Sequence, residues 1–222
     1  MFCLKVAVIM VYHDDYAEKY FEACFRSLEA QSPVNAKVEY FAVDNGASEN
    51  SARLVKSLAP RYRRLDNQSN KGWASGNNLA IQMVLSEDFD YIISLNMDTI
   101  LDKDWLKSLI DFAVDRSDLH IFQSKILLHG TGRINSAGNR IHFLGYGYCL
   151  GYGETAGLSI RRPEADFASG AALLVKSEVF KRVGLFQEEY FMYYDDLEFC
   201  WRARLAGFRI GMAPDSHCYH KS

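Results

Sequence analysis

The feature that most constrains the fold of this chain is a repeated alternation of short apolar runs with longer amphipathic segments. Residues 5–12 are almost continuously apolar and rich in β-branched side chains, which is typical of a strand buried on both faces. Similar runs occur at 38–43 and 91–95, and apolar residues at helical spacing stand between them. Strands that alternate with helices of this length indicate βαβ crossovers. The sequence therefore predicts an α/β fold with an open, mainly parallel sheet flanked by helices on both faces.

The individual elements follow from periodicity and from capping residues. We expect strands at 5–12, 38–43, 62–65, 91–95, 167–175 and 208–212. We expect helices capped by Asp14 or Asp15 and by Ser48, and further helices at 74–86, from Trp105, at 177–183 and near 196–206. In the last helix, Leu197, Cys200, Trp201 and Leu205 are expected to face inward.

Between about 128 and 166 the composition changes to Gly, Tyr, Arg and Asn. We interpret this stretch as loops with short irregular strands, and long irregular segments inside a compact domain are often functional. No internal repeat is visible, so one domain over 1–222 is expected.

Composition excludes several classes of protein. The formal charge of -3 and the mixing of acidic and basic residues leave no basic stripe for a nucleic-acid backbone. Five widely spaced cysteines without a C-x-x-C pair favour reduced thiols and a cytoplasmic location. No apolar run approaches the roughly 18 residues of a spanning helix, so any membrane contact is expected to be peripheral.

Polar residues follow four of the expected strands or strand-like runs, where ligands bind in an open parallel sheet. These groups are Tyr12-His13-Asp14, Asp44-Asn45-Gly46, Asn70-Lys71-Gly72 and Asn96-Met97-Asp98. Taken alone, each acid also suits a helix cap or a turn. Together they line a crevice in which a divalent cation would have to bridge carboxylates to a diphosphate. Neither a G-x-G-x-x-G nor a G-x-x-x-x-G-K-[ST] motif is present, which argues against dinucleotide and P-loop sites.

A second acidic group, Asp195 and Asp196, follows the aromatic run 190–194. The two carboxylates either complement the dipole of the next helix or, with their pKa raised by the apolar surroundings, include a general base. His217 and His220 follow the last expected strand, as surface residues or as metal ligands.

Five motifs occur in order along the chain: Val43–Ser48, Asn70–Asn78, Leu95–Thr99, Ala168–Val175, and Val183–Phe186 continued by Phe191–Gly207. Together they resemble the inverting family 2 glycosyltransferases of GT-A fold, and bacterial rhamnosyltransferase-like members among them. The resemblance covers nearly the whole chain. It implies a GT-A domain in which 1–127 bind the nucleotide sugar and 128–222 form the acceptor and catalytic half, with the irregular region on the acceptor side.

The resemblance also assigns roles to residues at the donor. Asp44 matches the acid that contacts the nucleoside, Lys71 lies in the loop near the base, and Tyr12, Asn45 and Gly72 belong to the same donor-binding set. Asn96-Met97-Asp98 takes the place of the family's Asp-x-Asp, so Asp98 would ligate Mn²⁺ or Mg²⁺ with His220. Asn96 replaces the first acid, which leaves one anionic ligand fewer.

For the chemistry, the resemblance implies that Asp196 is the base and Asp195 its neighbour. The implied reaction moves a sugar, rhamnose being one candidate, from a TDP- or UDP-linked donor to a hydroxyl of a glycan or lipid-linked acceptor in cell-surface polysaccharide assembly. The implied location is cytoplasmic, with contact at the inner face of the cell membrane left open. Relatives usually continue past the position of His220, so we expect a chain truncated at its C-terminus.

Two other functions stay open from the residues. Asn96 and the early C-terminus are consistent with a catalytically silent module that binds a nucleotide or a glycan. A sugar nucleotidyltransferase would share the architecture and the metal, but it would carry a Gly-rich basic loop after the first strand, and none is present.

Overall fold

The computed structural model describes residues 4–157 and 164–221. At its centre is a sheet in the order β10-β12-β6-β11-β4-β1-β2-β3, with β5 paired to β12 and β7 paired to β6. The strands are β1 (Leu4–Asp14), β2 (Ala36–Ala47), β3 (Arg63–Asp66), β4 (Tyr91–Leu95), β5 (Thr99–Leu101), β6 (Ile121–Leu128), β7 (Arg133–Ser136), β10 (Glu164–Ala165), β11 (Ala172–Lys176) and β12 (Ile210–His220). A separate hairpin consists of β8 (Asn139–Ile141) and β9 (Gly147–Cys149).

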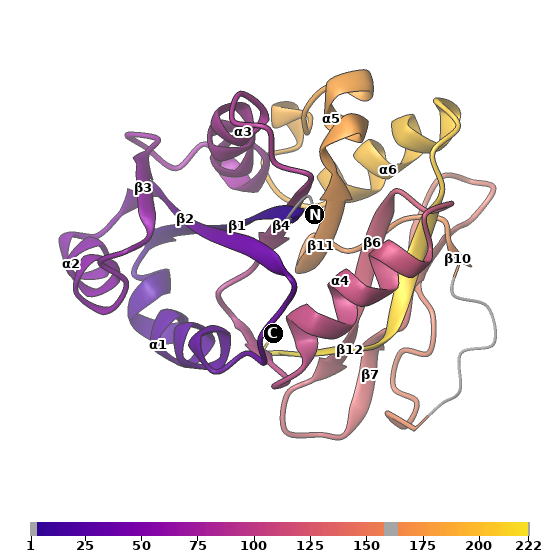
Figure 1. Ribbon diagram of the computed structural model, residues 1–222, viewed down its shortest axis with the longest axis horizontal. Coiled ribbons are helices and arrows are strands. Elements are labelled where there is room, and N and C mark those ends of the chain that lie inside the picture. The colour runs from indigo at the N-terminus through magenta and orange to yellow at the C-terminus, as the bar shows by residue number, and fades with distance from the viewer. Residues whose placement is uncertain (1–3, 158–163, 222) are drawn as a thin grey trace.

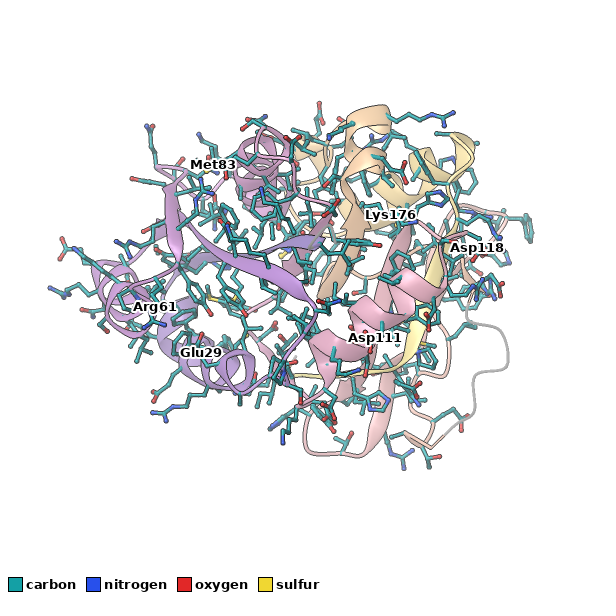
Figure 2. The ribbon with its side chains drawn as sticks, viewed as in Figure 1. Glu29, Arg61, Met83, Asp111, Asp118 and Lys176 are labelled. Carbon is teal, nitrogen blue, oxygen red and sulfur yellow. The ribbon has the colours of Figure 1, made fainter. Side chains whose placement is uncertain are left out.

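Helices cover both faces of the sheet (Figure 1). They are α1 (Tyr16–Glu29), α2 (Glu49–Leu58), α3 (Gly72–Leu85), α4 (Trp105–Asp115), α5 (Ser177–Val183) and α6 (Asp195–Leu205), with a 3₁₀ turn η1 (Glu188–Tyr190). Side chains alternate across each strand, so Val8 and Met10 of β1 pack with α1, α2 and α4, whereas Ala7 and Ile9 pack with α3, α5 and α6. Side chains fill the space between the sheet and both helical layers (Figure 2).

The predicted α/β class and the mainly parallel sheet are confirmed. β4, β1, β2 and β3 are parallel neighbours, and so are β6 and β12. β11 lies between the two parallel groups and is antiparallel to both β4 and β6. It enters the sheet from the irregular region without a crossover helix, so its direction is not restricted as in a βαβ unit.

Three predicted strand boundaries were wrong. The strand expected at 38–43 continues through Asp44-Asn45-Gly46 to Ala47, and its pairing with β1 shifts register after the Tyr12–Asp44 pair. The strand expected at 167–175 begins only at Ala172, because the amides of Ser169 and Gly170 donate to side chains instead of to a ladder. The strand expected to end at Met212 continues to His220, with a register shift between Ala213 and His217 that accommodates Pro214.

The predicted inner face of α6 was also wrong in part. Trp201 and Leu205 are exposed, whereas Phe199, Cys200 and Ala203 are buried. The first turn of α6 faces inward with its two carboxylates, and the buried residues follow Asp196 at i+3, i+4 and i+7. The inner face of this helix therefore carries these three core residues together with the acids of its first turn, and Trp201 and Leu205 lie outside it.

The N-terminal cap predicted for α2 is present, whereas the side-chain cap predicted for α1 is not. Ser48 caps α2, since its hydroxyl accepts the Ser51 N–H at 3.0 Å. Asp15 occupies the N-cap position of α1, but its carboxylate accepts from Lys19 instead of from a helix amide.

The irregular stretch predicted at 128–166 contains short strands β7, β8, β9 and β10 among turns, within the described residues. Cys24, Cys149, Cys200 and Cys218 are free thiols, and Cys3 lies outside the described residues. Across the part of the chain that the structure describes, no helix has the length and apolarity needed to cross a bilayer.

Candidate active site

A cavity of about 580 Å³ opens where the carboxyl ends of β1, β2 and β4 meet the segment before α6. Its lining consists of Val11, His13, Tyr16, Asn45, Asn70, Gly72, Trp73, Asn96, Asp98, Ser169, Gly170, Ala171, residues 191–196 and His220. The groups after all four predicted strand ends thus contribute to one cavity, together with the two acids before α6 and the terminal histidine.

Asp98 and His220 meet at one wall of this cavity. Asp98 lies in the turn between β4 and β5, and the antiparallel pairing of Thr99 with His220 brings the last strand beside it. His220 Nε2 is 3.2 Å from Asp98 Oδ2. Burial by itself would raise the pKa of the Asp98 carboxyl, but the hydrogen bond and charge of His220, helped by Tyr16, hold it below its usual value.

The donor atoms of this wall fit a hard divalent cation. Asp98 Oδ1 is buried and has no hydrogen-bond partner among the described residues. The carboxylate suits Mn²⁺ or Mg²⁺, the imidazole favours Mn²⁺ of the two, and the remaining positions of such ions are commonly filled by phosphate oxygens and water. The described residues contain no group of three or more His, Cys, Asp or Glu that could hold a metal. A metal here would therefore take two ligands from this pair and the others from its substrate.

Asp195 and Asp196 form the opposite acidic part of the site at the start of α6. Asp196 accepts the Gly170 N–H at 2.8 Å and the Leu197 N–H at 2.7 Å, which fixes the direction of its carboxylate. Burial raises its pKa in spite of these two bonds. Burial, followed by the charge of Asp196, raises the pKa of Asp195 to about 6. The pKa of each acid is thus shifted upward, the direction that makes a carboxylate a stronger base.

Asn45 joins the end of β2 to the loop before α3. Its amide nitrogen donates to Asn70 Oδ1 at 3.2 Å and to the Gly72 carbonyl at 3.1 Å. Its oxygen accepts the Asn67 amide at 2.8 Å and the Lys71 N–H at 3.3 Å. This buried network holds the loop over the sheet, so Asn45 both lines the cavity and shapes it.

Three predicted donor-binding residues do not line the cavity. Tyr12 is 2% exposed and packs in the core against the helices of the other face. Burial and the charge of Asp44, its partner across β1 and β2, raise the pKa of the Tyr12 phenol. Asp44 Oδ1 accepts the Ala47 N–H, and Lys71 is exposed. The roles predicted for these three side chains stay predictions.

The sequence analysis did not predict three parts of the site, namely Trp73, Tyr16 and the Ser169-Gly170 turn. Trp73 Nε1 donates to Asn96 Oδ1 at 3.0 Å. Its ring covers Gly170, where an added Cβ would come within 2.8 Å of it. The sequence did contain a sign that these residues belong to the site, because Trp73 and Gly170 lie within the motifs that resemble the family. In addition, an indole N–H near a core requires a hydrogen-bond acceptor.

The segment 191–194 closes the cavity in a strained conformation. Phe191, Tyr193 and Tyr194 have positive φ values of 57°, 70° and 66°. The Phe191 carbonyl accepts the Trp73 N–H at 2.8 Å, so this segment is tied to the first turn of α3. Backbone strain of this kind persists only where the surroundings impose it, and it is concentrated at functional sites.

Comparison with known proteins identifies the family. The family described as "Glycosyl transferase family 2" matches residues 7–184. The chain belongs to glycosyl transferase family 2. Two relatives agree with this assignment. The low-salt glycan biosynthesis hexosyltransferase Agl10 of Haloferax volcanii is 26% identical over 186 residues, 81% of this chain and 58% of that protein. The rhamnosyltransferase WbbL of Escherichia coli K12 is 27% identical over 224 residues, 94% and 79% of the two chains.

Solved structures show the same fold. Staphylococcus aureus TarS superposes with a TM-score of 0.73 at 17% identity, over 99% of this family 2 chain and 37% of TarS. GalNAc-T7, solved with UDP, GalNAc and Mn²⁺, gives a TM-score of 0.77 at 12% identity, over 99% and 44% of the two chains. The GT-A fold predicted from the sequence is confirmed, and this chain spans less than half of each of these two structures.

Proposed function

We propose that this chain is an inverting glycosyltransferase that moves a sugar from a UDP- or TDP-linked donor to a hydroxyl of a glycan or lipid-linked acceptor. The observation that carries the proposal is the single cavity that holds the Asp98–His220 pair and the Asp195–Asp196 pair. Sugar transfer is supported by the names of two relatives, a hexosyltransferase for glycan biosynthesis and a rhamnosyltransferase. Rhamnose is therefore one candidate sugar. Polysaccharide assembly on the cytoplasmic side, with peripheral contact at the inner membrane face, is part of the same proposal.

The proposed reaction begins with deprotonation of the acceptor. Asp196 takes the proton of the acceptor hydroxyl, whose oxygen attacks the anomeric carbon as the bond from that carbon to the diphosphate breaks. The nucleoside diphosphate leaves with the bonding electrons, and the configuration inverts because attack comes from the opposite face. The Gly170 and Leu197 N–H groups hold the carboxylate in place for this transfer.

The donor is proposed to lie along 1–127, where Asn45 and Gly72 shape the cavity and Asp44, Lys71 and Tyr12 support the nucleoside end. Asp98 and His220 would hold a divalent cation on the diphosphate, where it supplies charge stabilisation to the leaving group. The acceptor is proposed to lie along 128–222, where the exposed aromatic residues of 190–194 offer surfaces for sugar rings.

Replacement of the base tests this function. Asp196→Asn is expected to lower turnover by about 10²- to 10⁴-fold, as for loss of a general base, while calorimetry shows nearly unchanged donor binding. Near wild-type turnover in Asp196→Asn would remove Asp196 from the role. A wild-type chain that binds nucleotides but transfers and hydrolyses none of a panel of donors would instead be the silent binding module.

A further inference from the structure

The side chain of Asn96 has a defined orientation in this chain, in which asparagine stands at the first position of the Asn96-Met97-Asp98 turn. An indole N–H donates and never accepts, so the atom that Asn96 turns toward Trp73 must be its oxygen. The backbone of Asn96 is also engaged, because its N–H donates to Ala171 and its carbonyl accepts from Thr99. The side-chain nitrogen, Nδ2, is the polar atom of Asn96 that has no hydrogen bond within the described residues.

That nitrogen faces the cavity. Asn96 is half-buried and lines the cavity beside Asp98. No hydrogen bond from Nδ2 occurs within residues 4–157 and 164–221, and Nδ2 is not among the buried side-chain atoms that lack a partner there. It is therefore open to the cavity, where it presents a hydrogen-bond donor.

Trp73 is held firmly enough to impose this orientation. Its ring packs edge-on against Phe186 at 4.9 Å between centroids and lies over Gly170, whose N–H donates to Asp196. Its own backbone N–H is bonded to Phe191. A flip of the Asn96 amide would leave the indole N–H facing an N–H₂ group, which loses a buried hydrogen bond.

We propose that Trp73 is a positioning residue that locks Asn96 as a hydrogen-bond donor to an oxygen of the bound nucleotide sugar, in its diphosphate or its sugar, and not as a ligand of the metal. This inference rests on the proposed function, since it requires a nucleotide donor in the cavity. It assigns the protein's contribution to metal binding to Asp98 and His220 alone.

The test compares nucleotide binding by calorimetry in Asn96→Ala, Trp73→Phe and the double variant. Trp73→Phe retains a ring over Gly170 but removes the N–H, and Trp201→Phe, at an exposed position on α6, is the matched control. UDP, TDP and UDP-glucose are titrated in saturating Mn²⁺ and in EDTA, with melting temperatures recorded to confirm folding.

Asn96→Ala is expected to bind about 10-fold more weakly, as for loss of one hydrogen bond to a charged group. The ratio of affinities with and without Mn²⁺ is expected to stay as in wild type, because no metal ligand is lost. Trp73→Phe is expected to weaken binding only when Asn96 is present, so the double variant equals Asn96→Ala. A loss already seen with UDP assigns the contact to the diphosphate, and a loss confined to UDP-glucose assigns it to the sugar.

Three results would overturn the inference: unchanged affinity in Asn96→Ala, a loss in Asn96→Ala that appears only with Mn²⁺, or additive effects of the two substitutions. Failure of the wild-type chain to bind any nucleotide with Mn²⁺ would have a different meaning. It would overturn the proposed function itself.

Discussion

Asp195 illustrates how burial changes the chemistry of a single residue. It is 5% exposed, its Oδ1 accepts the Asp196 N–H, and its Oδ2 has no hydrogen-bond partner among the described residues. Burial, followed by the neighbouring charge of Asp196, raises its pKa to about 6. At neutral pH the protein keeps this carboxylate charged at a cost in stability, which is common for groups in functional sites.

The pH dependence of stability follows from that shift. A carboxyl with a raised pKa binds its proton more tightly in the folded state, so it stabilises the fold below about pH 4 and loses this contribution as pH rises through about 6. Asp195→Asn is expected to be about 1–3 kcal/mol more stable than wild type at pH 8 and equally stable at pH 4. Urea unfolding at both pH values measures the difference. Asp115→Asn, at an exposed site, is the control, and an equal gain in both variants would contradict the argument.

At the scale of elements, the first turn of α3 depends on a glycine. Gly72 has φ of +91°, and an added Cβ would lie 2.2 Å from the Phe191 carbonyl oxygen. This close approach lets the Trp73 N–H reach that oxygen, so α3 and the segment before α6 share one contact point. The element boundary is therefore set by a neighbour more than 100 residues away in the sequence.

Gly72→Ala separates steric conflict from backbone strain. Gly145 provides the control, since it has φ of +90° and nothing within 4 Å of an added Cβ. Gly145→Ala is expected to cost about 1 kcal/mol from strain alone, and Gly72→Ala at least about 2 kcal/mol more. Chemical denaturation measures both costs. Equal costs would mean that the segment 191–194 moves aside freely.

The molecule as a whole brings distant parts of the chain to one cavity. β12 is the last strand, yet its pairing with β5 and β6 places His220 next to Asp98, which follows β4. β11, antiparallel between the two parallel groups, places Ser169 and Gly170 beneath α6. The Asp98–His220 pair and the Asp195–Asp196 pair therefore line one cavity because of sheet order, and not because of closeness in sequence.

Metal-linked stabilisation tests this assembly. A nucleoside diphosphate with Mn²⁺ is expected to raise the melting temperature, because both would bind only the folded chain. His220→Ala is expected to weaken the Mn²⁺-dependent part of the binding by at least about tenfold. His217→Ala is the control, since its ring bonds the Pro214 carbonyl on the same strand and does not line the cavity. Equal metal dependence in wild type and His220→Ala would exclude His220 as a ligand.

Local patterns in the sequence determined β1 to β4 and most of the helices, because periodicity and caps depend on residues close together, but they did not reveal β6. The run 91–95 coincides with β4, 177–183 coincides with α5, and Ser48 caps α2. The polar ends of the parallel strands were equally predictable, since strands in one direction end at one edge. Asn45, Asn96 and Asp98, predicted in this way, line the cavity.

Only the tertiary structure decided which side chains meet there. Tyr12 belongs to β1, which extends to Asp14, and it is buried on the same face as Val8 and Met10. Trp73 turns toward Asn96, a direction that residues nearby in sequence do not encode. β5 has three residues, too few to show a hydrophobic period, and the inner face of α6 combines Asp195 with Phe199, Cys200 and Ala203. These features depend on long-range packing and hydrogen bonding, whose free energy exceeds local preference and appears only once the sheet is assembled.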